Sequence, residues 1–247
     1  MIRQQGFRAL AVVWLSAAAL AAEFTVGVED IDYFPIFSVS GPEQRYVGYA
    51  RDVLDRFAAQ HGHRFVYRPL PVKRLYREYW QGRFDLVFPD SPRWNSDTKR
   101  QQGLELHYSA PLLVFQNVIL VKPERLGRGR ESVQVLGVIR GFTPWKFQDD
   151  ITAGRIRVEE AQGARELLKM AMLDRVDAVD MAWQVANHHL RALKAEGALV
   201  PDPGLLDIQD SHYYLSSRRH PELIRQFDQF LSRNANEIAA LRRRYGL

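Results

Sequence analysis

Apolar residues in the first third of the chain alternate between short continuous runs and helical stripes. Phe24 to Val28, Phe65 to Leu70 and Phe84 to Phe88 are apolar runs of the length of a buried strand. Between them, residues 53–62 and 71–81 place apolar side chains three or four positions apart, as on a helix with one buried face. This alternation predicts a parallel sheet that carries helices on its faces.

The same pattern restarts in the second half of the chain. The predicted elements are strands at 133–139, 156–159 and 177–180, a helix that begins at Pro144, and helices at 163–173 and 182–195. The chain then returns through a strand at 212–216 to a helix that begins at Pro221 and a last helix at 238–245. The long apolar run at 112–121 reads as an extended segment between the two units. The predicted fold class is therefore α/β with two similar units.

The first residues have the pattern of a secretory signal peptide. Arg3 and Arg8 give a positive start, residues 9–20 are apolar, and Ala19-Leu20-Ala21 is a small-residue cleavage pattern. The apolar part is shorter than the roughly 20 residues that a membrane span needs, although a retained anchor is the alternative. We expect residues 1–22 to be removed and the rest to be exported to a bacterial periplasm.

Composition narrows the possible chemistry. The chain has no cysteine, which excludes disulfides, thiolate metal sites and a lipid anchor on an N-terminal cysteine. The formal net charge is +5, and the basic residues are scattered among acidic ones apart from Arg242 to Arg244. For an exported protein this charge predicts at most a mild preference for anionic partners, and no nucleic-acid partner is expected.

Two loops rich in polar and aromatic residues follow predicted strands. One, at 89–100, contains Asp90, Trp94 and Arg100, and the other, at 29–35, contains Asp32 and Phe34. In an open α/β sheet, ligands bind just beyond the carboxyl ends of the strands. These residues are therefore candidate ligand contacts, and the alternative is that the loops are merely solvated.

Five short elements, in this order and spacing, resemble the periplasmic solute-binding proteins of the amino-acid-binding type, also called family 3. The elements are FPIF at 34–37, VGYARD at 47–52, QGRFDLV at 81–87, YSAP at 108–111 and VDAV at 176–179. The resemblance covers essentially the whole chain from Phe24 onward. It implies a two-lobed periplasmic binding protein-like fold of type II, with two hinge strands and a ligand cleft between the lobes. Lobe 1 would be 23–116 plus 211–247, and lobe 2 would be 117–210.

The resemblance also implies which charged groups meet a ligand. The family holds a ligand carboxylate with an Arg that follows a Thr, which here indicates Arg100 after Thr98, with Arg93 as the rival. The family's amine-binding Asp falls on Ala182, so a standard α-amino acid would lack its usual counter-charge. Asp180 either replaces that residue through a local shift or caps the next helix.

Further contacts are implied on the second lobe. Thr143, in Gly141-Phe142-Thr143, matches a Gly-Thr-Thr element, and its hydroxyl would meet an anion or simply cap a helix. Trp94, Trp145, Trp183 and Phe34 fall near the implied cleft, where aromatic walls suit a flat or cationic ligand; the alternative is that they pack in the core.

The function implied by the resemblance is capture of a small polar or amino-acid-like molecule for an ABC-type transporter or a membrane sensor, by a monomer without a cofactor. The pairs His61/His63 and His188/His189 lack a third ligand, so no metal site is predicted. The alternative is a periplasmic enzyme on the same fold, similar to the cyclohexadienyl and arogenate dehydratases. Its general acid could be Asp90, Glu29 or Asp180.

Overall fold

The computed structural model describes residues 22–205 and 209–247. In its first part, β1 (Glu23–Glu29) lies between β5 (Arg64–Leu70) and β6 (Leu86–Asp90), and it is parallel to both. Helices α1 (Tyr49–Gln60) and α2 (Val72–Trp80) connect these strands, so the predicted alternation is confirmed. The strand predicted at 84–88 begins and ends two residues later, because Asp90 pairs with Tyr214 of a neighbouring strand.

The second part repeats this plan. Strand β9 (Val135–Ile139) lies between β10 (Arg157–Ala161) and β11 (Ala178–Ala182), again parallel, with helices α5 (Ala164–Met172) and α6 (Trp183–Ala192) following β10 and β11. The helix predicted from Pro144 is a single 3-10 turn, η3 (Trp145–Phe147), followed by the short α4 (Gln148–Thr152). Two further 3-10 turns, η1 (Pro123–Arg125) and η2 (Arg130–Ser132), lie in the charged segment before β9.

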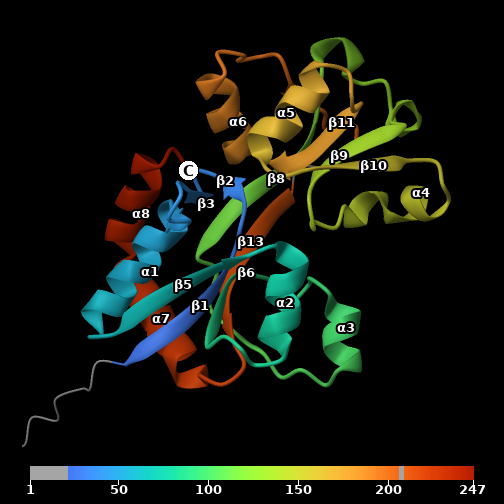
Figure 1. The fold of residues 1–247 in the computed structure, drawn as a ribbon. Helices are drawn as coiled ribbons and strands as arrows, with labels where there is room; N and C mark the ends of the chain where they lie inside the picture. Colours follow the sequence, from blue (N-terminus) through green and yellow to red (C-terminus); the bar gives the residue numbers. More distant parts are fainter. Residues whose placement is uncertain (1–21, 206–208) are drawn as a thin grey trace, which may run out of the picture.

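Two long strands join the parts. Strands β8 (Leu113–Val121) and β13 (Gln209–Ser217) are antiparallel neighbours; β8 also pairs with β11, and β13 with β6. The resulting sheet has the order β10-β9-β11-β8-β13-β6-β1-β5, with β12 (Val200–Pro201) beside β8 and β7 (His107–Tyr108) beside β13. Figure 1 shows β8 and β13 running between the two parts.

We use "first half" for the elements β1 to β7 with the C-terminal helices, and "second half" for β9 to β12 with α4 to α6. The expected crossings at 112–121 and 212–216 fall on β8 and β13. The lobe boundaries at residues 116–117 and 210–211 stay predictions.

Two features of the first half were not predicted. Where a loop was expected, the short strands β2 (Asp32–Tyr33), β3 (Phe37–Ser40) and β4 (Arg45–Val47) form a small antiparallel sheet. Strands of two to four residues are too short to show an alternating pattern. The short helix α3 (Ser96–Gln101) was also missed, inside the segment predicted as a polar loop.

The C-terminal helices return to the first half. Helix α7 (Pro221–Arg233) packs on β13, and α8 (Ala235–Arg244) packs on α1, as Figure 1 shows. Phe57 of α1 and Phe227 of α7 place their ring centroids 5.1 Å apart. The main apolar cluster is continuous from this region into the second half, where it includes residues of β11, α5 and α6.

Among the described residues, no helix is long and apolar enough to cross a membrane. The predicted signal peptide lies outside the described residues, apart from residue 22.

Candidate functional site

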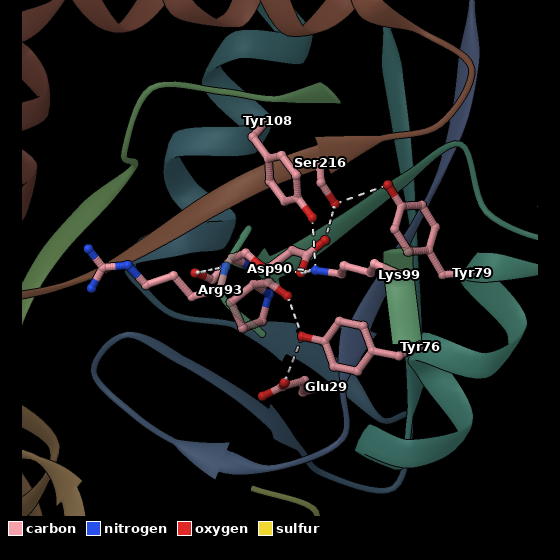
Figure 2. A network of polar contacts seen from close by, with 10 residues as sticks. Glu29, Tyr76, Tyr79, Asp90, Arg93, Lys99, Tyr108 and Ser216 are labelled. Atoms are coloured by element: carbon pink, nitrogen blue, oxygen red, sulfur yellow. Dashed lines mark hydrogen bonds and ion pairs between the residues drawn. The ribbon is translucent and has the colours of Figure 1, made fainter. Parts of the chain in front are cut away.

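The carboxyl end of β6 carries a buried ion pair. Asp90 is fully buried, and its Oδ1 accepts hydrogen bonds from Lys99 Nζ at 3.0 Å and from the Ser91 N–H at 2.7 Å. Its Oδ2 accepts one from the Ser216 hydroxyl at 2.7 Å. Burial raises the pKa of Asp90, while the Lys99 charge and these hydrogen bonds oppose the shift. Asp90 is therefore held by residues of its own loop and by Ser216, as Figure 2 shows.

Lys99 has an acceptor for each of its three ammonium hydrogens. Besides Asp90, it donates to the Ser91 carbonyl at 2.8 Å and to the Tyr108 hydroxyl at 2.8 Å. The network continues from Asp90 through Ser216 to Tyr79, whose hydroxyl lies 3.0 Å from Ser216 Oγ. Since Ser216 lies on β13, this network connects the loop after β6 to one of the two strands that join the halves.

Glu29, at the carboxyl end of β1, is a second buried acid. Burial raises its pKa to about 8. The Tyr76 hydroxyl lies 2.6 Å from the Pro89 carbonyl and 3.2 Å from Glu29 Oε1. A tyrosine has one hydroxyl hydrogen and a carbonyl can only accept, so a protonated Glu29 that donates to Tyr76 satisfies both contacts. Glu29 Oε2 is buried without a hydrogen-bond partner among the described residues.

In the second half, Asp180 of β11 is a third acid, and its charge acts on Tyr33 of the first half. Asn117 of β8 donates to its Oδ1 at 2.6 Å. Burial raises the pKa of Asp180 to about 6, against the opposing effects of Asn117 and of the Lys146 charge. Burial raises the pKa of Tyr213 on β13, and the charges of Glu29 and Asp180 raise it further. The negative charge of one acid from each half therefore acts on Tyr213.

The two halves are in direct contact beside these acids. The backbone N–H of Ala182, in the second half, donates to the hydroxyl oxygen of Tyr33, in the first half, at 2.8 Å. The Tyr33 ring also meets Phe142 at 5.6 Å between centroids. A Cβ at Gly141 would lie 2.8 Å from Cβ of Val72 on α2, so backbone and side chain approach closely there.

A groove of about 410 Å³ opens between the halves next to this contact. Its walls are residues 30–32 of the first half, and Gln162, Gly163, Arg165 and Glu166 at the start of α5. Asp32 is therefore at the boundary between the halves, as its prediction as a ligand contact requires. Phe34 is also there, with its ring 4.8 Å from that of His188 on α6.

The remaining predicted contacts differ in their surroundings. Trp94 is partly buried, and its ring centroid lies 5.6 Å from that of Tyr213. Trp183 is partly buried and packs against the main apolar cluster. Thr143 is exposed, and Trp145 is 60% exposed with Lys146 Nζ 4.8 Å from its ring. The structure thus brings Asp32, Phe34 and Asp180 to the boundary between the halves, and leaves Thr143 and Trp145 at the surface. The ligand-binding roles of all these residues stay predictions.

Arg100 and Arg93 have different partners. The Arg100 side chain is 76% exposed and pairs with Asp97 of its own helix at 2.9 Å. The Arg93 guanidinium has no ion pair or hydrogen bond among the described residues, and Figure 2 shows it extending away from the Asp90 network. Of the two rivals for a ligand carboxylate, Arg93 is the one whose side chain has no polar partner in the described part of the chain.

Sequence reasoning missed Lys99 and Asn117. Lys99 stands between two residues that the resemblance singles out, and nothing in the sequence shows that it turns inward in place of Arg100. Asn117 is a polar residue within the long apolar run at 112–121, and the sequence does not show that it donates to a buried carboxylate. Among the described residues, no group of three or more His, Asp or Glu side chains is arranged to hold a metal ion.

The comparisons with known proteins identify the fold. No family model and no curated protein matches the chain. Solved structures do match, over 90% of this chain. The substrate-binding protein of an ABC uptake transporter from Streptococcus pneumoniae, with bound histidine, has a TM-score of 0.71 at 16% identity and is covered to 92%.

Two other matches have different titles. A histidine kinase sensor domain similar to periplasmic binding proteins has a TM-score of 0.70 at 17% identity, and 95% of it is covered. An ancestral amino-acid-binding protein, described as a precursor of cyclohexadienyl dehydratase, has a TM-score of 0.68 at 18% identity, also with 95% covered. The chain therefore has the mixed α/β, type II periplasmic binding protein fold. This fold is shared by transporter binding proteins and sensor domains.

Proposed function

We propose that this chain is an extracytoplasmic solute-binding protein that captures a small polar or amino-acid-like molecule between its halves. The observation that carries the proposal is the contact from Tyr33 to Ala182 between two α/β halves that β8 and β13 join. Such a pair of strands can act as a hinge, and the residues beside the contact come from both halves. An ABC-type transporter or a membrane sensor would be the downstream partner.

Two side chains are the best candidates for charged contacts with the solute. Arg93 is exposed and has no charged partner among the described residues, and it would suit a carboxylate through bidentate hydrogen bonding. Asp180 would suit a cationic group, and its pKa near 6 leaves it ionised at neutral pH. Asp90 is a weaker candidate than its position suggests, because Lys99 would have to be displaced before a ligand could reach it.

The test begins with a thermal-shift screen of amino acids, polyamines, organic acids and aromatic acids. A ligand at 100 times its dissociation constant adds about 2.7 kcal/mol to the free energy of unfolding. The dissociation constant of each hit is then measured by calorimetry, and the radius of gyration by solution scattering. We expect compaction on binding. If no compound in these classes binds, or if a tight ligand causes no compaction, the proposal fails.

Arg93→Ala and Arg100→Ala form a matched pair for the same assay. For a ligand with a carboxylate, losing one charge-assisted contact costs about 1.5–3 kcal/mol, or roughly ten- to a hundredfold in affinity. We expect this loss in Arg93→Ala and wild-type affinity in Arg100→Ala. If Arg100→Ala lost affinity and Arg93→Ala did not, Arg100 would be the residue that contacts the carboxylate.

One observation favours an enzyme as the second candidate function. A carboxylic acid that stays protonated at neutral pH can act as a general acid, and Glu29 has a pKa of about 8. A dehydratase similar to those that act on prephenate or arogenate would use such a group to protonate a leaving hydroxyl. Turnover of either compound by the purified protein, lost in Glu29→Gln, would establish this activity. Absence of turnover would leave solute binding as the remaining proposed function.

A further inference from the structure

Three consecutive residues of the first half, at positions 32–34, reach the helix α6 of the second half. The Tyr33 hydroxyl accepts the N–H of Ala182, which directly precedes α6, at 2.8 Å. The Phe34 ring lies 4.8 Å from the ring of His188. Because residues 32–34 and α6 belong to different halves, these contacts form only when the halves are close together. We call residues 32–34 together with α6 the clasp.

The third contact of the clasp joins two groups that can carry charge. Nε2 of His189 lies 3.9 Å from Oδ1 of Asp32, which is too far for a hydrogen bond and close enough for a charge interaction. His189 is 2% exposed, and neither of its ring nitrogens has a hydrogen-bond partner among the described residues. Asp32 is less enclosed, and its Oδ1 accepts a hydrogen bond from the Ser38 hydroxyl at 3.0 Å.

Among the described residues, three titratable or charged groups act on the His189 ring. They are Asp32 from β2, Arg165 from α5 and His188 from α6 itself. The other strands packed on α6 are β8, which has no ionisable residue, and β11, where Asp180 is bonded to Asn117. Burial lowers the pKa of His189, and so do His188 and Arg165, whereas Asp32 opposes the shift. In the closed arrangement the neutral ring is therefore favoured.

We propose that the clasp makes closing of the two halves depend on pH, with His189 neutral when the halves are closed and protonated when they are open. In the open arrangement Asp32 moves away and the ring meets water, where an imidazole takes up a proton near pH 6.5. Closing must then release that proton. Acidification through this range consequently favours the open arrangement, and each pH unit by which the two pKa values differ corresponds to a tenfold change in the closed-to-open ratio.

The experiment measures the radius of gyration of the processed chain by solution scattering between pH 7.5 and pH 5, with no solute added. The wild-type radius should rise as the pH falls, with its midpoint below about 6.5. His189→Gln keeps a polar side chain that cannot titrate, so its radius should stay constant. His107→Gln makes the same change on β7 of the first half, outside the clasp, and it should keep the wild-type rise.

A second measurement follows the ring protons of His189 by NMR. Its pKa should lie below about 6.5 in the wild type, and lower still in Asp32→Asn, which removes the one opposing charge. This titration also tests the proposal if His189→Gln does not fold. The proposal is overturned by a wild-type radius that does not change, by a rise that persists in His189→Gln or disappears in His107→Gln, or by a His189 pKa that Asp32→Asn leaves unchanged or raises. No ligand takes part, so the result is independent of the proposed solute-binding function.

Discussion

Lys99 Nζ lies 3.0 Å from Asp90 Oδ1, and both side chains are buried at the carboxyl end of β6. A buried ion pair of this kind is not itself strong evidence of stabilisation, since desolvation offsets the attraction. Breaking it on one side is nevertheless costly, because the remaining charge has no partner.

The first prediction concerns this pair. Lys99→Met should lower the free energy of unfolding by about 3–5 kcal/mol, because Asp90 would stay buried without its counter-charge. Arg100→Met is the matched control, and its effect should lie within about 0.5 kcal/mol because that side chain is exposed. Urea unfolding of both variants at pH 7 measures the difference. A larger loss in Arg100→Met than in Lys99→Met would mean that the inward and outward positions of these neighbours are reversed, and equal losses would contradict the expected cost of breaking the buried pair.

The second prediction concerns Glu29 and pH. Its pKa is about 8 in the folded protein and near 4.5 in the unfolded chain. Between these values the folded state holds a proton that the unfolded state has lost, so the wild-type free energy of unfolding falls as the pH rises. Glu29→Gln removes this pH dependence. Its free energy of unfolding, relative to that of the wild type, should therefore rise from pH 5 to pH 9, by at most about 1.4 kcal/mol for each unit by which the folded and unfolded pKa values differ.

Urea unfolding at pH 5, 7 and 9 checks this expectation. Glu43→Gln is the control, because Glu43 is exposed in the turn before β4 and should leave the wild-type slope unchanged. If Glu29→Gln and the wild type gave parallel pH profiles, Glu29 would be ionised in the folded protein.

The third prediction concerns the close approach of the halves at Gly141. Its φ is +90°, and an added Cβ would lie 2.8 Å from Cβ of Val72. Gly141→Ala should therefore push the halves apart and enlarge the radius of gyration. Gly154→Ala has a similar backbone cost, since its φ is +71°, but no atom lies within 4 Å of the added Cβ. Solution scattering at pH 7.5 should show expansion in the first variant alone, and expansion in both would assign the effect to the backbone.

The fourth prediction concerns the N-terminus. Arg3, Arg8 and the apolar residues 9–20 indicate cleavage after residue 21 or 22 when the protein is exported. Intact-mass analysis of protein from the periplasmic fraction should give a chain that begins at Ala22 or Glu23. A mass that includes Met1 would contradict both the cleavage and the predicted location.

The sequence was sufficient for the long elements and insufficient for short ones. Apolar runs located β1, β5, β9 and β11, and helical stripes located α1, α2, α5 and α7, each to within a few residues. Burial on both faces produces such runs in the inner strands β1, β9 and β11, whereas β5 is the edge strand and only partly buried. Strands β2 to β4 have too few residues for any periodicity, so their small sheet had no signal in the sequence.

The candidate site shows a different limit. Asp180 ends the strand predicted at 177–180, and Asp32 and Phe34 lie in the polar segment after the strand predicted at 24–28. The structure places all three where the halves meet. Lys99 and Arg100 are adjacent cations on one short helix, and adjacent residues of a helix point about 100° apart. A rotation of the helix by that amount exchanges which of them is buried. Composition and spacing are the same in both arrangements, so only the packing of α3 against β6 distinguishes them.

The position of β13 determines the order in which the fold can be completed. Strand β6 pairs with β1 on one side and with β13 on the other, and β13 ends at Ser217. As the chain emerges from its N-terminus, one edge of β6 stays without its partner until more than a hundred further residues have been made. An apolar strand with an open edge is prone to pair with other chains, so this protein depends on being kept apart from its neighbours during synthesis, until its C-terminal segment arrives.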